Sequence, residues 1–353
     1  MDPIRRSHPL SLVLVLALLV PSTAWTAAGD AGLYDQPVLV LDPDLHTAAI
    51  RRADVSATGA YAVTGSYDKT VRIWAAPTGL LLRTIRLPQG PGPVGKVYAV
   101  AISPDGTLVA ASGYTGVEDQ PKSIYLFQRD TGALVQRLEG LPDVVNHLVF
   151  SPTGRSLAAT RGGMGGLRVY DRDAGWREVA RDAPYGADSY GAAFAADGRL
   201  ATTSWDGTLR LYDRTFRRVA TAKTTDGTRP FGLAFTPAGD QLAIGYDDTP
   251  AVSLVDGHTL TPLPGPDTRG IDPGNLPIVT WSANGTTLYA GGSHNRTGTM
   301  SLVAWSEAGA DPRRERAAST NTIMSLLPLP DGGVLVGAAD PWLAVLDAAD
   351  LRG

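Results

Sequence analysis

One segment has the spacing of a phosphate-binding loop, Gly90-Pro91-Gly92-Pro93-Val94-Gly95-Lys96. Such a loop turns backbone N–H groups onto a phosphate at the start of a helix, and a Ser or Thr after the lysine reaches Mg²⁺. Here two prolines remove N–H donors, Val97 follows the lysine, and the apolar residues 97–102 predict a strand. We therefore interpret the segment as a linker and predict no cofactor.

The side chains that could bind a metal are scattered. The chain has no cysteine, and its five histidines lie far apart at positions 8, 46, 147, 258 and 294. The acidic pairs Asp42/Asp44 and Asp247-Asp248 lack the further carboxylates and the glycine of a calcium loop. No Gly-x-Ser-x-Gly nucleophile motif occurs. We predict no catalytic residue and no metal site, although a site assembled from several distant segments stays open.

Composition limits the class of partner. The 353 residues are 43% hydrophobic and 19% charged, which supports a large core, and the formal net charge is −4. A weakly acidic protein does not attract phosphate backbones, so we expect no nucleic-acid partner.

Residues 1–28 have the three-part layout of a secretory signal peptide. Arg5 and Arg6 precede an uncharged apolar run from Pro9 to Val20, and Thr26-Ala27-Ala28 supplies small residues for cleavage. As a helix the run spans about 18 Å, short of a bilayer core of about 30 Å. We predict a periplasmic or secreted protein with no membrane association after cleavage; the alternative is an uncleaved anchor or a buried helix.

The rest of the chain repeats itself. Each unit has an apolar strand, a Pro/Ala-x-Gly turn and a second strand of small apolar residues. Proline presets φ for such a turn, and glycine supplies a positive φ. The turn glycines are Gly59, Gly106, Gly154, Gly198, Gly239, Gly285 and Gly332.

A second marker ends the third strand of each unit, as in Ile73-Trp74, Tyr170-Asp171 and Tyr212-Asp213. Both markers give seven units, and no stretch shows sustained helical periodicity. These features predict an all-β, seven-bladed β-propeller of four-stranded antiparallel blades. The segment Gln36–Leu41 reads as a strand without a partner of its own, so we expect it to close the ring by completing the last blade. The alternative is that a longer parent protein supplies that strand.

Two decapeptides, residues 65–74 (GSYDKTVRIW) and 204–213 (SWDGTLRLYD), resemble the WD-repeat signature. The resemblance covers residues 33–353 and is weaker in the later repeats, a degenerate pattern that suits an exported bacterial relative. It implies a structural hydrogen-bonded network within a blade. In the first blade its members would be His46, Thr64 or Ser66, Asp68 and Trp74; in the fourth only Asp206 and Thr202 or Ser204 match, with Tyr212 in place of Trp.

Aligning the repeats places two residues per blade on the face where WD-repeat propellers open their channel. The first set stands where the second strand ends: Tyr67, Tyr114, Arg161, Trp205, Tyr246, His294 and Ala339. The second set begins the first strand: Arg51, Tyr98, Asn146, Tyr190, Phe231, Pro277 and Met324. Aromatic residues are far more frequent here than their 7% in the chain, and Tyr, Trp and Arg dominate binding hot spots.

The sequence therefore predicts a monomeric, non-catalytic platform for a protein or peptide, with Tyr67, Tyr114, Arg161, Trp205, Tyr246, His294, Arg51, Tyr98, Tyr190 and Phe231 as binding residues. Capping of strand ends is the alternative role for these side chains. An enzyme or small-ligand binder at the channel mouth, and a sensor module of a larger signalling protein, are the alternative functions.

Overall fold

The computed structural model describes residues 44–117, 120–306 and 313–347. The chain divides into two units, Met1–Val38 and Leu39–Gly353. The predicted signal peptide and the predicted closing strand Gln36–Leu41 lie outside the described residues. Among the described residues, no helix has the length and apolar character needed to span a membrane.

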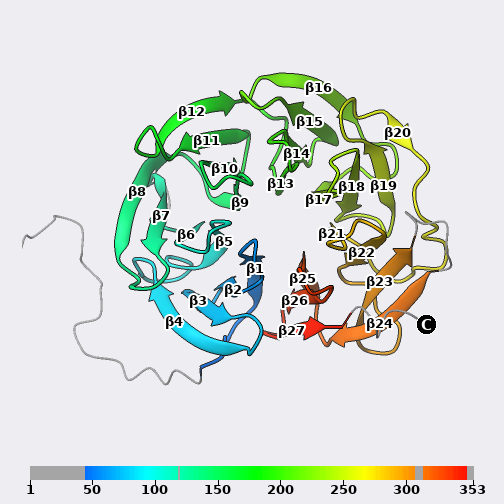
Figure 1. The fold of residues 1–353 in the computed structure, drawn as a ribbon, viewed down its shortest axis with the longest axis horizontal. Helices are drawn as coiled ribbons and strands as arrows, with labels where there is room; N and C mark the ends of the chain where they lie inside the picture. Colours follow the sequence, from blue (N-terminus) through cyan, green and yellow to red (C-terminus); the bar gives the residue numbers. More distant parts are fainter. Residues whose placement is uncertain (1–43, 118–119, 307–312, 348–353) are drawn as a thin grey trace, which may run out of the picture. The chain divides into compact units, whose positions relative to one another are not determined.

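Seven antiparallel sheets follow one another around a ring (Figure 1), which makes the second unit a seven-bladed β-propeller. Blades are numbered 1 to 7 in chain order, and their strands are a to d from the axis outward. Blade 1 holds β1 (Ile50–Val55), β2 (Tyr61–Ser66), β3 (Thr70–Ala75) and β4 (Leu80–Arg86). Blade 2 holds β5 (Val97–Ile102), β6 (Leu108–Gly113), β7 (Lys122–Gln128) and β8 (Leu134–Leu141).

The same order continues through the next three blades. Blade 3 holds β9 (Val145–Phe150), β10 (Ser156–Arg161), β11 (Leu167–Asp171) and β12 (Arg177–Asp182). Blade 4 holds β13 (Gly191–Phe194), β14 (Leu200–Ser204), β15 (Thr208–Tyr212) and β16 (Arg218–Lys223). Blade 5 holds β17 (Pro230–Phe235), β18 (Gln241–Tyr246), β19 (Val252–Asp256) and β20 (Pro262–Leu263).

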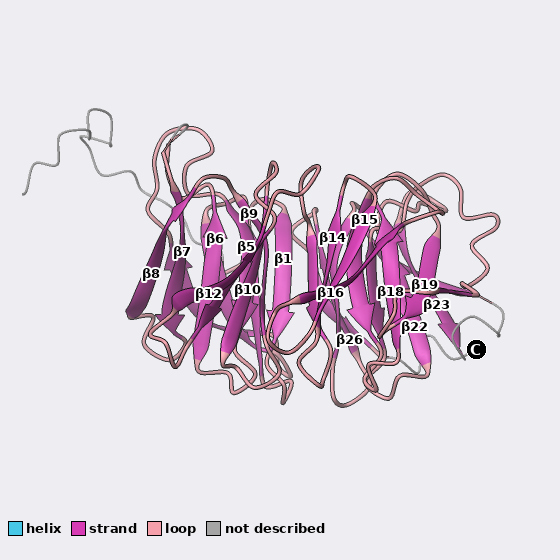
Figure 2. Cartoon of the chain, turned by 90° about the horizontal axis from the view of Figure 1, so that it is seen from above, coloured by secondary structure: helices cyan, strands magenta, loops and turns pink. Residues whose placement is uncertain are grey.

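The last two blades complete the ring. Blade 6 holds β21 (Ile278–Trp281), β22 (Thr287–Gly291), β23 (Met300–Ser306) and β24 (Arg314–Ser319). Blade 7 holds β25 (Ile323–Pro328), β26 (Val334–Ala338) and β27 (Leu343–Leu346), so within the described ranges it has three strands. Figure 2 shows the inner strands standing side by side, with the loops gathered at two opposite ends.

The turns predicted between strands a and b form in every blade. The seven turn glycines have φ values between 68° and 95°, a region that costs a glycine little and other residues more. The predicted strand at residues 97–102 coincides with β5. The repeat pattern therefore gave both the number and the internal order of the blades.

The core lies between the blades. Inner strands such as β6 and β10 are buried on both faces, because each sheet packs against two neighbours. A separate apolar cluster joins each adjacent pair of blades in the described chain. The cluster between the last blade and the first contains Leu329 and Leu335 with Ala53, Ala62 and Trp74. This contact joins the two ends of the blade sequence.

Candidate binding surface

The blade 1 residues implied by the WD-repeat resemblance lie within hydrogen-bond distance of one another. His46 Nε2 lies 2.7 Å from Thr64 Oγ1, and His46 Nδ1 lies 2.7 Å from Asp68 Oδ2. The Trp74 indole donates to Thr64 Oγ1 at 2.8 Å. Ser66 instead donates its hydroxyl to the Ala48 carbonyl at 2.8 Å. Burial alone would raise the pKa of Asp68, but the bonds from His46 and Thr70 hold it at about 2.

Aspartates in the b–c turns hold the loops at one end of the ring. The Thr47 amide donates to Asp68, and the Gly186 amide donates to Asp206 at 2.9 Å. Blades 5 and 7 repeat this contact, where Asp248 and Asp340 accept from the amides of Thr228 and Thr320. A carboxylate that accepts backbone N–H groups fixes loop geometry, so these aspartates position the face that the loops form.

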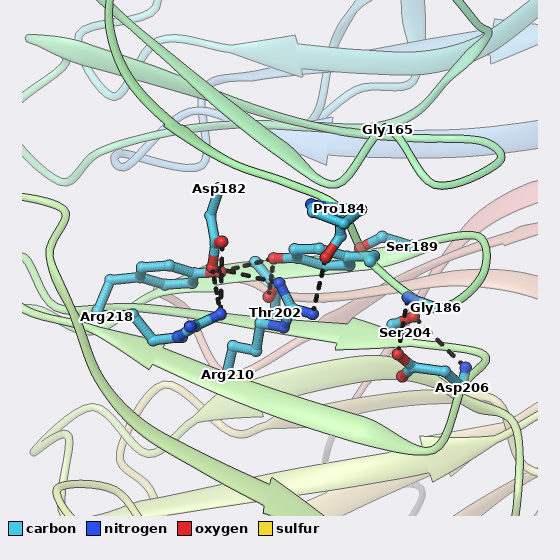
Figure 3. A network of polar contacts seen from close by, with 12 residues as sticks. Gly165, Asp182, Pro184, Gly186, Ser189, Thr202, Ser204, Asp206, Arg210 and Arg218 are labelled. Carbon is cyan, nitrogen blue, oxygen red and sulfur yellow. Dashed lines mark hydrogen bonds and ion pairs between the residues drawn. The ribbon is translucent and has the colours of Figure 1, made fainter.

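Blade 4 builds its internal network from two tyrosines (Figure 3). The Tyr185 hydroxyl lies 2.8 Å from Thr202 Oγ1 and 2.6 Å from the Tyr212 hydroxyl, and Tyr212 donates to Asp182 at 2.8 Å. Because Tyr212 gives its one hydrogen to Asp182, Tyr185 must donate to Tyr212 and accept from Thr202. The guanidinium of Arg210 covers the Tyr185 ring at 3.6 Å. Asp206, expected in this network, caps the loop instead.

Six half-buried side chains lie at the end of the channel where the b–c turns are. They are Arg51, Tyr67, Tyr98, Tyr114, Tyr190 and Trp205, and we call them the mouth surface. The rings of Tyr67 and Tyr114 contact Tyr98, with centroid separations of 5.0 and 5.1 Å. Burial and the neighbouring Tyr67 raise the pKa of Tyr98 to about 12. Blades 1 and 2 thus supply a continuous tyrosine cluster.

A second aromatic group comes from blades 4 and 5. Tyr190 packs against Trp205 at 4.5 Å and stacks on Phe231 at 5.0 Å. Arg51 lies beside the first group, with its guanidinium 5.2 Å from the Tyr67 centroid and 5.5 Å from that of Tyr98. Arg51, Tyr190 and Trp205 also line a cavity of about 290 Å³ together with Phe231, Pro277, Met324 and Ala339. The structure therefore brings together residues of both aligned sets.

Three of the predicted binding residues lie inside the protein. Arg161 and His294 are 2% exposed and Tyr246 is fully buried. The Tyr246 hydroxyl bonds to Ser253 at 2.6 Å, and His294 lies 3.2 Å from the Glu315 carboxylate. Arg161 donates to the Gly165 carbonyl within its own loop. We therefore leave these three out of the mouth surface, which is smaller than the sequence suggested; Phe231, 6% exposed, supports it from below.

The other motifs form no site of their own. Residues 90–96 lie between β4 and β5 as a loop, and the Gly90 amide bonds to the Val94 carbonyl. In the described residues, no group of three or more His, Asp or Glu side chains could hold a metal ion.

Comparison with known proteins places these features in a family context. The model of "WD domain, G-beta repeat" matches residues 37–75, 83–117 and 187–213. The matches cover strands a to c of blades 1 and 4 and strands a and b of blade 2. Three segments of this seven-bladed β-propeller are therefore similar to WD repeats.

The similar proteins match parts of this propeller. The chain is 30% identical to WD repeat-containing protein VIP3 of Arabidopsis thaliana over 165 residues, 43% of this chain and 48% of that protein. It is 38% identical to small ribosomal subunit protein RACK1y of Oryza sativa over 22% of each. Similarity to the protein LST8 homolog of Drosophila melanogaster is 30% over 31% of each. The chain spans less than half the length of each of these relatives.

Sequence reasoning missed two residues of the propeller that the geometry makes prominent. Tyr185 lies 21 positions before Asp206, close to the spacing of His46 and Asp68 in blade 1, so spacing without residue type would have found it. Arg52 is nearly buried beside the mouth surface and donates to the Tyr190 carbonyl at 2.6 Å. In the sequence, Arg52 stands out only as a charged residue within a strand that the repeat pattern places next to the axis.

Proposed function

We propose that this propeller is a non-catalytic interaction scaffold whose mouth surface binds a protein or peptide. One observation supports this proposal most directly. Tyr67 and Tyr114 contact Tyr98 at one end of the channel, and Arg51 lies beside this group. Tyr190 and Trp205 line a cavity beside them. Rigid aromatic rings offer large contact areas at low entropic cost, and arginine adds directional donors. Loops fixed by the aspartates of the b–c turns keep these side chains in place before a partner arrives.

The comparisons support an interaction role in general terms. VIP3 is named as a WD repeat-containing protein, and the name of RACK1y places it in a small ribosomal subunit. We infer that the partner of this chain is a protein or peptide. We further propose that the chain is a bacterial, exported monomer with degenerate later repeats. Its residues 1–28 would act as a signal peptide and direct it to the periplasm or the exterior.

A capture experiment tests the mouth surface. The mature chain would be immobilised and exposed to a cell-envelope extract, beside a Tyr67→Ala, Tyr114→Ala, Trp205→Ala variant. These three side chains are half-buried, and Trp205 also packs against an apolar cluster between blades, so the variant must be shown to fold. We expect a partner held by the native chain to be lost, or held at least tenfold more weakly, by the variant.

The matched control is Tyr61→Ala, which removes a half-buried tyrosine at the opposite end of blade 1, where Arg129 covers its ring at 3.6 Å. This control should capture the same partner as the native chain. Circular dichroism and thermal melting would establish that all variants are folded. Equal capture by the folded triple variant would reject the mouth surface as the binding site.

A further inference from the structure

The ring encloses a second cavity along its axis, which adjoins the cavity at the mouth at Ile278. Its volume is about 310 Å³, and strands a of all seven blades line it. It extends from Arg52 and His147, near the mouth, to Phe150 and Pro152, at the end of the ring where the a–b turns lie. Because a strand rises about 3.3 Å per residue, the wall from His147 to Pro152 is roughly 16 Å long.

Arg52 brings a buried charge to the upper end of this cavity. Its side chain leaves blade 1, donates from Nη2 to the Tyr190 carbonyl of blade 4 at 2.6 Å, and lies 5.3 Å from the Phe231 ring centroid. Burial and the neighbouring Arg51 lower the pKa of Arg52 to about 9, so the group is a cation at neutral pH. Within the described chain it forms no ion pair with a carboxylate. Buried cations in proteins are normally paired, so this arrangement calls for an anion.

His147 supplies a second donor at the same level. The Ala192 amide donates to His147 Nδ1 at 3.0 Å, so this nitrogen carries no hydrogen. Burial, and then the charge of Arg52, lower the pKa of His147 well below its usual value, which keeps the ring neutral. The one ring hydrogen therefore resides on Nε2 of a residue that lines the cavity, and the one hydrogen bond seen for His147 within the described ranges is at Nδ1. Arg52 and His147 contact residues 190 and 192 of the same chain segment, about 7 Å apart.

The remaining walls are mostly apolar. Small and aliphatic residues surround the middle of the cavity, among them Ala53, Leu148, Ala193 and Leu326. Phe150, Phe194 and Phe235 lie at the lower end. The cavity is thus polar with hydrogen-bond donors at one end and hydrophobic along the rest, the layout that fits an amphipathic small molecule.

The charges select a monoanion. Asp54 shares the cavity, but its carboxyl is held on the wall by the amides of Val55 and Ile102 at 2.9 and 2.8 Å. One guanidinium and one neutral imidazole match a single negative charge, and guanidinium geometry suits a carboxylate. A phosphate dianion would leave a second charge without compensation in a site that already contains Asp54.

We propose that the axial channel binds a monocarboxylate with a short apolar tail, whose carboxylate is held by Arg52 and His147 while its tail packs along the channel walls. The volume equals about ten water molecules at roughly 30 Å³ each, which limits the ligand to about that number of heavy atoms. This site is distinct from the mouth surface, so it stands or fails independently of the proposed partner.

Isothermal titration of the chain with octanoate at neutral pH tests the site directly. We expect saturable binding of one octanoate per chain, at least tenfold weaker binding of the neutral octanamide, and no saturable binding of inorganic phosphate. Acetate, which has the charge without the tail, should bind at least tenfold more weakly than octanoate. These comparisons use the native chain and do not depend on any variant folding.

Two variants locate the binding site. Arg52→Gln removes the cation and should weaken octanoate binding at least tenfold. Arg83→Gln is the control, because Arg83 lies on β4, the outermost strand of the same blade, and this variant should bind octanoate as the native chain does. Failure of octanoate to saturate, equal affinity for octanamide, or undiminished binding by Arg52→Gln would overturn the proposal.

The carboxylate could come from a free acid or from the C-terminus of a peptide with apolar last residues. A second titration therefore uses the dipeptide Gly-Leu, whose size is nearer to the volume limit, with a free or an amidated C-terminus. Tighter binding of the free peptide than of octanoate would assign the site to a peptide end, and the reverse order would assign it to a free acid. Loss of all binding in both series would reject the site.

Discussion

At the scale of the residue, blades 1 and 4 reach one structural result with different side chains. In blade 1 an imidazole joins Thr64 to Asp68, and in blade 4 the Tyr185 hydroxyl joins Thr202 to Tyr212. A phenol can accept and donate at once, as a neutral imidazole can. The exchange is therefore chemically conservative, although the residue types differ.

The Tyr212→Phe substitution tests the importance of the blade 4 network. It removes the only hydroxyl that links Tyr185 to Asp182, and it should lower the free energy of unfolding by about 1–3 kcal/mol. The control is Tyr170→Phe, at the equivalent position of blade 3, where the buried hydroxyl has no hydrogen-bond partner among the described residues. Urea unfolding should show this control to be neutral or slightly stabilised. Equal losses in both variants would contradict the network.

Residue alignment predicted which side chains stand at the mouth but not which remain accessible. Tyr67 and Tyr246 hold the same place in their repeats, yet only Tyr67 is accessible. The backbone of Gly227 lies against the Tyr246 ring so closely that a Cβ there would overlap it. In blade 3 the loop of residues 162–166 lies as close to Arg161, because a Cβ on Gly165 would overlap the Arg161 guanidinium and the Gly165 carbonyl accepts a hydrogen bond from it. Loop conformation decides such burial, and the repeat pattern contains no information on it.

At the scale of the element, short local signals were enough to define the strands. A Pro/Ala-x-Gly turn precedes strand b, and a residue pair such as Tyr-Asp ends strand c. The spacing of these two markers along the chain is enough to predict the order of the strands. Contacts between blades are harder to predict from the sequence. Gly191 in β13 lies so close to blade 5 that a Cβ would overlap the Phe231 carbonyl and approach Thr203 Oγ1. Its φ is not positive, so packing explains this glycine and turn geometry does not.

Substitution of Gly191 should therefore separate blades 4 and 5. Gly191→Ala has no free volume to enter, and we expect a loss at or above the upper end of the usual range of about 1–3 kcal/mol for overpacking. Gly79→Ala is the matched control: its φ is +68°, but nothing lies within 4 Å of the added carbon. The control should cost about 1 kcal/mol from backbone strain alone. Chemical denaturation of both variants would measure the difference, and equal losses would refute the packing account.

At the scale of the whole molecule, the repeat count and ring were predictable because seven similar units must bury their faces against one another. The completion of blade 7 is still a prediction. In the described residues β27 pairs with β26 alone.

Proline substitutions in the predicted strand test this closure. Adjacent amides in a strand point to opposite edges, so of Val38→Pro and Leu39→Pro only one removes a ladder hydrogen bond. We expect one of the pair to lower the free energy of unfolding by about 1–3 kcal/mol more than the other. Ala31→Pro, upstream of the predicted strand, should leave the melting temperature unchanged. If all three variants melt like the native chain, the strand does not close the ring.

The reach of Arg52 across the channel also bears on how the ring opens. In a repeat array where each unit touches only its neighbours, a local fluctuation spreads one unit at a time. Arg52 belongs to blade 1, yet it bonds to the backbone of blade 4 and covers a ring of blade 5. The two halves of the circle are thereby coupled through its centre. Local unfolding of blade 1 therefore breaks a hydrogen bond to residue 190 of blade 4 before blades 2 and 3 unfold.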